Sequence, residues 1–359
     1  MTSISQKDNK PSLTVSSLYT ASFQTMGKEW NRLIETSSAK TDPLVKKAAE
    51  ILKRGGVGAF PTETVYGLGA NVFDRKAVAR IFAIKGRPSD NPLIVHIAER
   101  EQLQILADDI PAVTAHLIET FWPGPLTLVL KRAVSVPDIV SANLPTVAVR
   151  MPNHKVALEL IQALNAPIAA PSANRSGRPS PTSARAVHKE LGTDADFILD
   201  GGDCAVGLES TVLDLTAIPP KILRPGGITA EQLISVIGEV VPYSKENQSG
   251  LSPGQKHAHY TPALKLILVE PNAWQDVLQK ALPLGEKIGV ISLKEVSSLS
   301  LVYIKVMVDI FDYAKNLFAA LYEAEAKGVE VLFVEKVAKE GVGVAIMDRL
   351  ERAAGFAQS

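Results

Sequence analysis

Residues 57–69 read VGAFPTETVYGLG, a short apolar run followed directly by a proline and a group of hydroxyl residues. The first four residues have the composition of a buried β-strand, and Pro61 ends it. In open α/β sheets, ligands bind at the loops that follow the strands. The stretch therefore predicts a strand at 57–60 and a loop that holds a small polar substrate. Because Thr62 or Thr64 could also cap a short helical turn, the local sequence leaves both interpretations open.

Similar apolar runs recur as far as residue 223 and alternate with segments of helical periodicity. They predict further strands at 93–97, 126–130, 147–149, 168–170, 197–199, 211–215 and 222–223. The helical segments are 42–52, 75–84, 99–107, 111–121, 154–164, 182–191 and 230–237. Several neighbouring strands have no helix between them. We therefore expect an α/β fold with a twisted mixed sheet and flanking helices, not a purely parallel sheet.

A change of composition between Val240 and Pro262 marks a domain boundary, because Pro, Ser, Gly, Lys, Asn and Gln follow one another there without periodicity. Beyond it, the sequence predicts a small open α/β sheet of Rossmann-like type. Its strands are expected at 264–269, 288–291, 303–308 and 331–334, and its helices at 272–282, 309–327 and 344–354.

These boundaries divide the chain into four parts. The polar segment 1–40 lacks hydrophobic periodicity and is expected to be disordered or loosely packed. A main domain at 41–240, a linker at 241–262 and a C-terminal domain at 263–359 follow it.

Composition excludes several classes of protein. Lysine plus arginine and aspartate plus glutamate each number 38 in the 359 residues, so no overall positive field exists to hold a nucleic acid. The single Cys204 excludes an internal disulfide and multi-cysteine zinc sites, and we expect it to be a buried structural thiol. No apolar run approaches the roughly 20 residues that span a bilayer. We therefore expect a cytoplasmic protein with no membrane partner.

The common nucleotide and catalytic signatures are absent from the sequence. It contains no G-x-x-x-x-G-K-[ST] loop, no G-x-G-x-x-G after a strand, no H-E-x-x-H and no G-x-S-x-G. If the protein uses a nucleotide, it must bind the phosphates by another route.

Two cations at a predicted helix exit offer such a route. Lys85 and Arg87 flank a glycine in KGRPSDNP at 85–92, and the prolines stiffen the segment. A rigid pair of cations suits phosphate, and arginine can contact it with two donors. The alternative is a favourable interaction with the carboxyl end of the helix.

Two further polar residues stand on strands. His96 lies among Leu93, Ile94, Val95 and Ile97, where a lone histidine is more often a core residue than a ligand. Arg150 closes the run at 147–149, and a buried arginine demands an anionic partner. That partner is either a protein carboxylate or the carboxylate of a substrate.

Small polar side chains follow other strands. PSAN at 171–174, PSPT at 179–182, EST at 209–211 and RPGG at 224–227 allow close approach of the backbone to a phosphate or ribose. Each segment is a weak signal when taken alone.

Taken together, these stretches resemble the YrdC-like family, and the whole chain resembles its two-domain form, the threonylcarbamoyl-AMP synthases. The resemblance rests on PTETVYGLG at 61–69, KGRPSDNPLIVHI at 85–97, WPGPLTLVL at 122–130, TVAVRMP at 146–152, APSAN at 170–174, ESTVLDL at 209–215, LRPGG at 223–227 and SPGQKHAHYTP at 252–262. One departure is Gln255, which stands where this family commonly has methionine.

The resemblance implies synthesis of threonylcarbamoyl-AMP and pyrophosphate from L-threonine, bicarbonate and ATP, the first step of threonylcarbamoyladenosine formation in tRNA. By resemblance, Lys85 and Arg87 are the catalytic residues. The residues implied for threonine are Thr62, His96, Arg150, Ala170 and Ser210. Those implied for ATP are Lys85, Arg87, Ser89, Thr146, Ser172, Asn174, Ser180, Arg224 and Tyr260. Mg²⁺ is expected to bind through ATP phosphates and water, with no protein metal site and no tightly bound organic cofactor.

The resemblance also implies transient contact with a tRNA threonylcarbamoyltransferase, and we expect any contact with tRNA itself to be weak. The linker is hypothesised to act as a lid that brings Tyr260 to the nucleotide, the alternative being an inert tether. Two rival functions are a module that binds double-stranded RNA and a carbamoyltransferase maturation factor. Neutral total charge argues against the first, and the single cysteine removes the zinc elements of the second.

Overall fold

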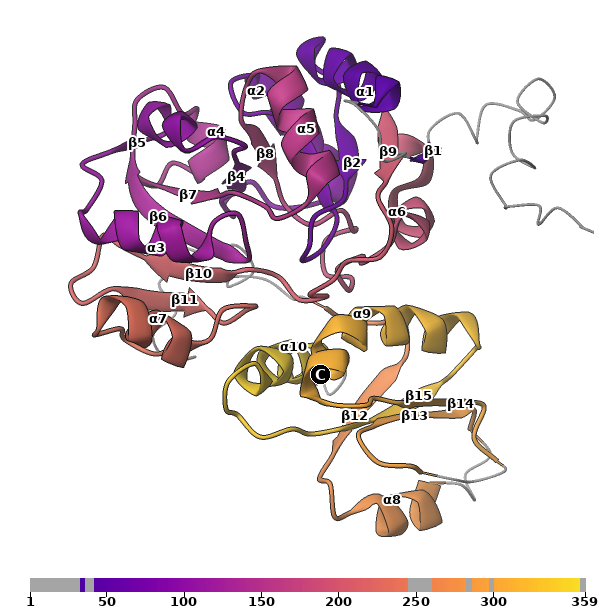
Figure 1. The fold of residues 1–359 in the computed structure, drawn as a ribbon. Coiled ribbons are helices and arrows are strands. Elements are labelled where there is room, and N and C mark those ends of the chain that lie inside the picture. Colours follow the sequence, from indigo (N-terminus) through magenta and orange to yellow (C-terminus); the bar gives the residue numbers. More distant parts are fainter. Residues whose placement is uncertain (1–32, 36–41, 245–259, 282–285, 297–299, 356–359) are drawn as a thin grey trace, which may run out of the picture.

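The alternating strands and helices of the sequence fold into two sheets, which belong to two domains (Figure 1). The structure is a computed structural model, and it describes residues 33–35, 42–244, 260–281, 286–296 and 300–355. No helix within these residues is long and apolar enough to cross a membrane.

The larger sheet is mixed. Its order is β1-β9-β2-β3-β8-β4-β7-β6-β10-β11, with β5 paired to β6. The strands are β1 (Leu33–Glu35), β2 (Gly58–Phe60), β3 (Gly67–Asn71), β4 (Ile94–His96), β5 (Ala107–Asp108), β6 (Leu126–Arg132), β7 (Thr146–Arg150), β8 (Ile168–Ala170), β9 (Phe197–Asp200), β10 (Thr211–Asp214) and β11 (Lys221–Arg224). Since β4 and β7 are parallel while β6 and β7 are antiparallel, the prediction of a mixed sheet is confirmed.

In this domain, α1 and α2 begin after residues whose side chains cap them, and α2 ends at a glycine. They are α1 (Pro43–Lys53), α2 (Arg75–Lys85), α3 (Val113–Phe121), α4 (Asp138–Ser141), α5 (Lys155–Leu164), α6 (Ala184–Leu191) and α7 (Ala230–Ile237). The Asp42 side chain caps α1, which begins at Pro43, and Asp74 caps α2. Gly86 ends α2 in the left-handed conformation with φ of 62°. The turn at Gly86 leads the chain from Lys85 toward the sheet.

Several stretches of this domain differ from the prediction. The segment 99–107 is not an α-helix but a 3-10 helix at Arg100–Ile105, which a capping box at Glu99 begins. Ala107 and Asp108 then pair with β6 as a strand, which ends the helical stretch. Strands β1, β3 and β5 and the short helix α4 were not predicted. The glycines of β3 give it little β propensity, and β1 lies within the segment 1–40 that was expected to be disordered or loosely packed but pairs with β9.

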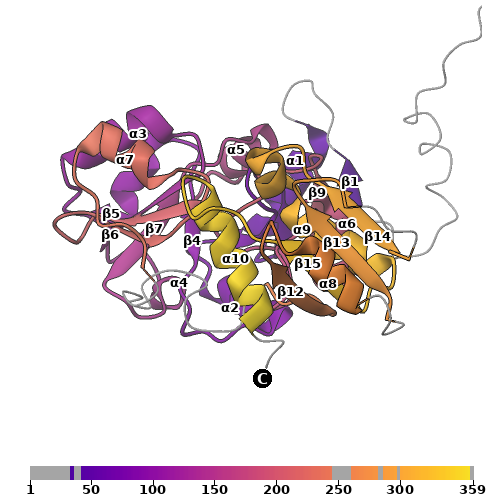
Figure 2. The same ribbon diagram turned by 90° about the horizontal axis from the view of Figure 1, so that it is seen from below.

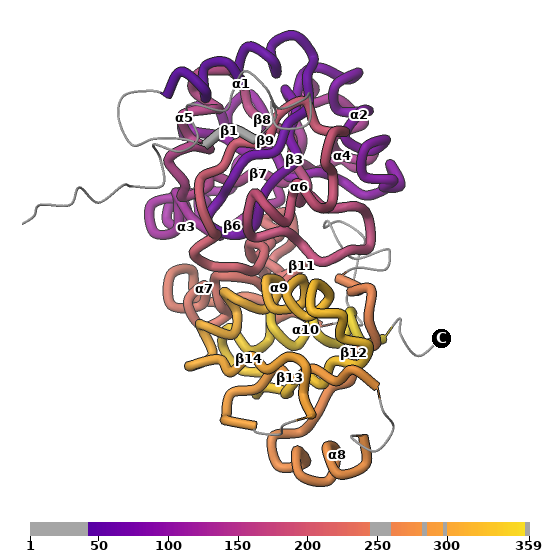
Figure 3. Tube along the Cα trace, turned by 90° about the vertical axis from the view of Figure 1, so that its right-hand side faces the viewer, coloured from indigo at the N-terminus to yellow at the C-terminus, as the bar shows by residue number. Residues whose placement is uncertain are grey.

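The C-terminal domain has a four-stranded parallel sheet in the order β12-β15-β13-β14. Its strands are β12 (Lys265–Val269), β13 (Ile288–Ser292), β14 (Tyr303–Val306) and β15 (Val331–Glu335), and its helices are α8 (Trp274–Ala281), α9 (Ile310–Ala326) and α10 (Gly343–Gly355). The expected small α/β sheet is therefore confirmed. Figures 1 and 3 show α9 and α10 between this sheet and the large domain, with α8 on the far side.

The two domains share an apolar cluster. Val65 and Leu208 of the large domain pack in one buried cluster with Leu317 and Phe318 of α9, and Tyr260 belongs to the same cluster. Seen from below, α3 and α7 lie at the end of the large domain away from the sheet of the C-terminal domain (Figure 2), while α10 lines a cavity together with α7. Most of the predicted linker, residues 245–259, lies outside the described residues.

The closeness of the domains can be tested at Gly207. Its φ is +77°, and a Cβ there would lie 2.1 Å from the carbonyl oxygen of Lys315 in α9. Gly202 is the matched control, because its φ is +84° but a Cβ would meet nothing within 4 Å. Gly202→Ala should lose about 1–2 kcal/mol of stability from backbone strain alone. Gly207→Ala should lose about 2–5 kcal/mol, since the clash adds to the strain. Urea unfolding measures both, and equal losses would contradict the described approach of α9 to Gly207.

Candidate active site

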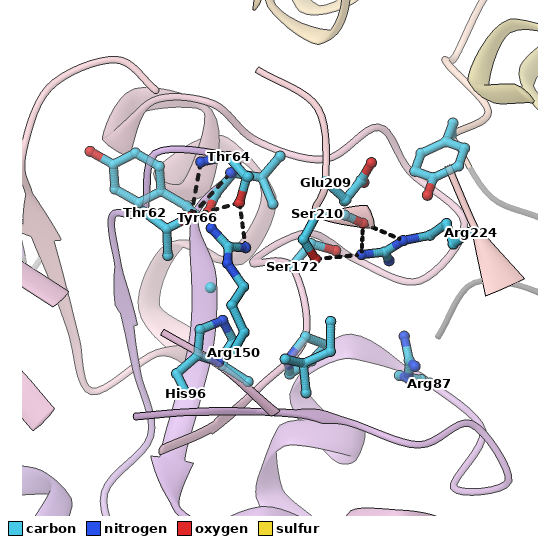
Figure 4. Close-up of a pocket in the computed structure, with 16 residues that line it drawn as sticks. Thr62, Thr64, Tyr66, Arg87, His96, Arg150, Ser172, Glu209, Ser210 and Arg224 are labelled. Carbon is cyan, nitrogen blue, oxygen red and sulfur yellow. Dashed lines mark hydrogen bonds between the residues drawn. The ribbon is translucent and has the colours of Figure 1, made fainter. Parts of the chain in front are cut away.

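A cleft opens on one face of the large sheet, where β2, β4, β7 and β10 end or begin (Figure 4). The structure brings together many of the site residues expected from the sequence. Those that line the cleft are Thr62, Arg87, His96, Arg150, Ala170, Ser172, Ser210, Arg224 and Tyr260. Its walls also contain residues that were not assigned a role, namely Thr64, Val65, Tyr66, Gly67, Ile94, Pro171 and Glu209.

Strand register brings His96 and Arg150 together. The two residues are partners across the parallel strands β4 and β7, at the carboxyl ends of both. Two positions earlier, Ile94 is the partner of Ala148, and both belong to a buried apolar cluster with Val129, Val212 and Leu223. Because side chains two residues apart lie on the same face of a sheet, this cluster lies on the face that carries His96 and Arg150, and its Ile94 lines the cleft as an apolar floor.

Arg150 has a protein carboxylate as its anionic partner. Its Nη2 atom lies 2.6 Å from Oε1 of Glu63. Its Nη1 atom donates to Oγ1 of Thr64 at 2.8 Å, and its Nε atom donates to the carbonyl oxygen of Gly124 at 3.2 Å. The sequence had left a protein or substrate carboxylate open, and the structure supplies the first. Contact of Arg150 with a threonine carboxylate stays a prediction.

His96 is neutral in the cleft. Burial lowers its pKa from 6.5 to about 3, and the charge of Arg150 acts in the same direction. Its ring meets the Phe60 ring edge-on, with centroids 5.8 Å apart. Within the described residues, Nδ1 of His96 has no hydrogen-bond partner. Nδ1 is buried, and the imidazole lines the cleft without a charge.

Of the two residues expected to be catalytic, Arg87 lines the cleft and Lys85 lies behind it. Lys85 is 3% exposed, and its Nζ atom donates to the carbonyl oxygens of Ser172 and Asn174, each at 2.5 Å. Burial, with the nearby charge of Arg87, holds the pKa of Lys85 well below its usual value. Lys85 thus supports the loop at 172–174 from behind and is not among the lining residues.

Arg87 does line the cleft. Its Nη2 atom donates to the carbonyl oxygen of Pro92 at 3.1 Å, and burial lowers its pKa to about 10. The guanidinium therefore stays charged near neutral pH. Figure 4 shows it standing apart from Arg150 and Arg224.

Arg224 lies against Ser210. Its Nε and Nη2 atoms donate to the Ser210 carbonyl oxygen at 3.1 and 2.9 Å, and Nη2 also contacts Oγ of Ser210 at 3.1 Å. That hydroxyl lies 2.7 Å from Oγ1 of Thr127. The hydrogen bonds of Arg224 go to uncharged groups, and the nearby Glu209 carboxylate interacts with the charge of Arg224 without a direct hydrogen bond among those described.

Other residues expected on the nucleotide side lie outside the cleft lining. Ser180 donates from Oγ to Oε1 of Glu209 at 2.5 Å, and Asn174 donates from Nδ2 to the carbonyl oxygen of Arg178 at 2.9 Å. Thr146 begins β7 and lies on the same face as Arg150 by strand alternation, whereas Ser89 is exposed. Their contact with a nucleotide stays a prediction.

Tyr260, at the end of the linker, lies at the cleft. It is 5% exposed, lines the cleft and stacks on Phe318 of α9 with ring centroids 5.4 Å apart. Within the described residues, no group of three or more His, Cys, Asp or Glu side chains is arranged to hold a metal ion. The chemistry available to the site is therefore that of arginines, hydroxyl groups and a neutral imidazole.

Two family models match consecutive parts of the chain. One described as telomere recombination matches residues 50–226, and one described as threonylcarbamoyl-AMP synthase, C-terminal domain, matches residues 228–355. A threonylcarbamoyl-AMP synthase of Pyrococcus abyssi is 45% identical over 322 residues, which are 87% of this chain and 94% of that protein. That of Bacillus subtilis is 42% identical over 91% of this chain and 98% of its own.

A solved structure agrees with these relatives. The crystal structure of P. abyssi Sua5 complexed with L-threonine has a TM-score of 0.86 at 43% identity, and the match covers 90% of this chain and 98% of that one. The likeness thus extends over both domains.

The neutral state of His96 can be tested by its effect on stability. Between pH 6.5 and 3 the unfolded chain binds a proton at this residue that the folded protein does not, so stability falls as the pH falls below 6.5. The loss should reach about 2 kcal/mol at pH 5. Urea unfolding at pH 7 and pH 5 should show this loss in the wild type and in a His116→Gln control at an exposed position. His96→Gln should lack it, and an equal pH dependence in all three proteins would contradict burial of a neutral imidazole.

Proposed function

The chain belongs to the threonylcarbamoyl-AMP synthase family, and we propose that its cleft converts L-threonine, bicarbonate and ATP into threonylcarbamoyl-AMP, pyrophosphate and water. The observation that carries this assignment is the meeting of Arg87, Arg150 and Arg224 in one cleft whose polar ends lie beside an apolar floor. The solved relative with L-threonine bound supports threonine as a substrate, and the relatives' name supports ATP.

The reaction needs positioning and charge neutralisation but no covalent nucleophile on the protein. The threonine amine attacks CO2 derived from bicarbonate and loses a proton, which gives N-carboxythreonine. The new carboxylate attacks the α-phosphorus of ATP, and the bond to pyrophosphate breaks. Cations aimed at the phosphates stabilise the charge that moves onto the leaving group. Cys204 is 3% exposed, and burial raises its pKa, so this thiol does not compete as a nucleophile.

The geometry supports a division of labour within the cleft. On one side Thr62, His96 and Arg150 would face threonine, with Glu63 and Thr64 fixing the arginine. On the other side Arg87, Ser172 and Arg224 would face the nucleotide, while Lys85 holds the loop that carries Ser172. The loop and the strand ends would bring the two substrates together, so that the carboxylate is formed beside the phosphate it attacks.

We propose that Mg²⁺ enters as part of the MgATP substrate. The described residues offer arginines at this cleft and no cluster of carboxylates that could form a metal cage. Since Mg²⁺ keeps several waters and binds phosphates readily, ATP itself can supply its ligands.

Three wider assignments remain proposals. The linker would act as a lid, which the position of Tyr260 on the cleft wall supports. The labile product would pass transiently to a tRNA threonylcarbamoyltransferase in the cytoplasm. Equal numbers of acidic and basic residues, 38 each, favour weak contact with tRNA over a stable complex.

The reaction and its phosphate cations are tested together. Purified protein incubated with MgATP, bicarbonate and L-threonine should yield threonylcarbamoyl-AMP, detected by mass. Arg87→Ala should lower the rate by about ten- to a hundredfold, because a charge-assisted contact worth roughly 1.5–3 kcal/mol is lost. Lys85→Ala should lower it similarly by releasing the loop at Ser172. Arg75→Ala, at the exposed start of the same helix, is the control.

No threonine-dependent product from the wild type would overturn the proposed function. Near-normal rates in both Arg87→Ala and Lys85→Ala would overturn the roles proposed for these two residues only.

The proposed contact of Arg150 with threonine can be tested by replacing its planar guanidinium with the ammonium of lysine. Its guanidinium contacts Glu63, Thr64 and Gly124 at once, which the single ammonium of lysine does not reproduce. Arg150→Lys should therefore raise the KM for threonine by about tenfold or more and change the KM for ATP much less. Steady-state kinetics with each substrate varied in turn makes the comparison. Equal increases for both substrates would show that Arg150 supports the cleft as a whole.

A further inference from the structure

An arginine of the C-terminal domain reaches the wall of the cleft. Arg349 of α10 is 1% exposed, and its Nε atom donates to Oε2 of Glu209 at 3.0 Å. Its Nη1 atom donates to the carbonyl oxygen of Pro225 at 2.8 Å and to Oδ2 of Asp348 at 3.0 Å. Pro225 directly follows Arg224, and Glu209 directly precedes Ser210. One side chain thus holds both segments that form this wall.

The Glu209 carboxylate contacts Arg349 with one oxygen and Ser180 with the other. While Oε2 accepts from Arg349, Oε1 accepts from the hydroxyl of Ser180 at 2.5 Å. Burial alone would raise the pKa of Glu209, but the charges of Arg349 and Arg224 hold it below its usual value. The carboxylate is therefore ionised, and it bridges the C-terminal domain to the loop that carries Ser180.

Arg349 also lies against Tyr260. Its guanidinium carbon is 5.6 Å from the centroid of the tyrosine ring, while Phe318 stacks on that ring. Tyr260 has a φ of 67°, a left-handed conformation that a bulky residue adopts only when its surroundings hold it there. Arg349 and Phe318 both belong to those surroundings, and both come from the C-terminal domain.

The same loop is held from a second side. Tyr322 of α9 donates its hydroxyl to the carbonyl oxygen of Pro179 at 2.7 Å, next to Ser180. Glu325 accepts from Nη2 of Arg178 at 2.7 Å. The segment 178–180 is thus fixed between α9 and the Glu209 bridge.

From these contacts we propose that Arg349 is a positioning residue for the ATP side of the cleft. It fixes Glu209, and through it Ser180, and it holds Tyr260 against the cleft wall. The C-terminal domain thereby completes the nucleotide site. This inference rests on the proposed function, because it assigns these groups to the nucleotide.

The competing explanation is that Arg349 only holds the two domains together. Arg352 provides the matched control. It lies on the same helix, three residues later, and it contacts Asp348 and the hydroxyl of Tyr243. Neither arginine lines the cleft itself, but Arg349 contacts the lining residue Glu209. Arg352 therefore joins parts of the same interface without reaching Glu209 in the contacts described.

The test uses the full-length protein with Arg349→Met, Arg349→Lys and Arg352→Met. Calorimetric titration with MgATP gives the dissociation constant, and steady-state kinetics gives the KM of each substrate. Arg349→Met should weaken both constants for ATP by about tenfold or more, with the KM for threonine changed less than about twofold. Arg349→Lys should recover part of the loss, because an ammonium can still pair with Glu209. Arg352→Met should leave both substrates near wild-type values.

Several outcomes would overturn the inference. Unchanged ATP constants in Arg349→Met would do so, as would equal increases for ATP and threonine or an equal ATP effect in Arg352→Met. If Arg349→Met does not fold, Arg349→Lys decides by the same comparison of ATP with threonine. Absence of ATP binding in the wild type would overturn the proposed function as well, whereas normal wild-type binding with an unaffected Arg349→Met overturns this inference alone.

Discussion

Backbone carbonyl groups at the strand ends and loops hold the buried cations of the cleft, and its chemistry depends on this arrangement. In the cleft, Arg87 donates to the carbonyl oxygen of Pro92 and Arg224 to that of Ser210, while Lys85 donates behind the cleft to those of Ser172 and Asn174. A carbonyl satisfies a donor without cancelling its charge, so the positive potential persists in a region shielded from water. An anionic substrate then gains attraction to cations that are already fixed in place, with little cost of ordering them.

Two buried carboxylates near the cleft instead form ion pairs with arginines. Glu63 pairs with Arg150, and Glu209 pairs with Arg349. A buried ion pair contributes little net stability, because desolvation offsets much of the attraction, but it fixes the position of both groups. Glu63 fixes the guanidinium beside His96, and Glu209 fixes the turn that leads into Ser210 and β10. The strand ends between them remain free for substrates over an apolar floor.

Local patterns in the sequence predicted what depends on local structure. The apolar runs placed most strands, and strand register alone explains why His96 and Arg150 meet. The helical segment predicted at 99–107 is a 3-10 helix that ends at Ile105, because Ala107 pairs with β6 as a strand. Lys85 was expected at the phosphates, yet the turn at Gly86 leaves its side chain behind the loop at Ser172. The contact of Arg349 with Glu209 joins residues 140 positions apart, and no local pattern encodes such a pair.

The packing of the C-terminal domain ties its presence to the shape of the cleft. Val65 belongs to the loop after β2 that also carries Thr62 and Thr64, and Leu208 directly precedes Glu209. Both apolar side chains are buried in the cluster of α9, so each end of the cleft is anchored on the same helix. Separating the domains would expose this apolar surface and leave Glu209 without its arginine, two costs that act together. A domain that supplies no lining residue among those described therefore controls the geometry of a site built by the other domain and the end of the linker.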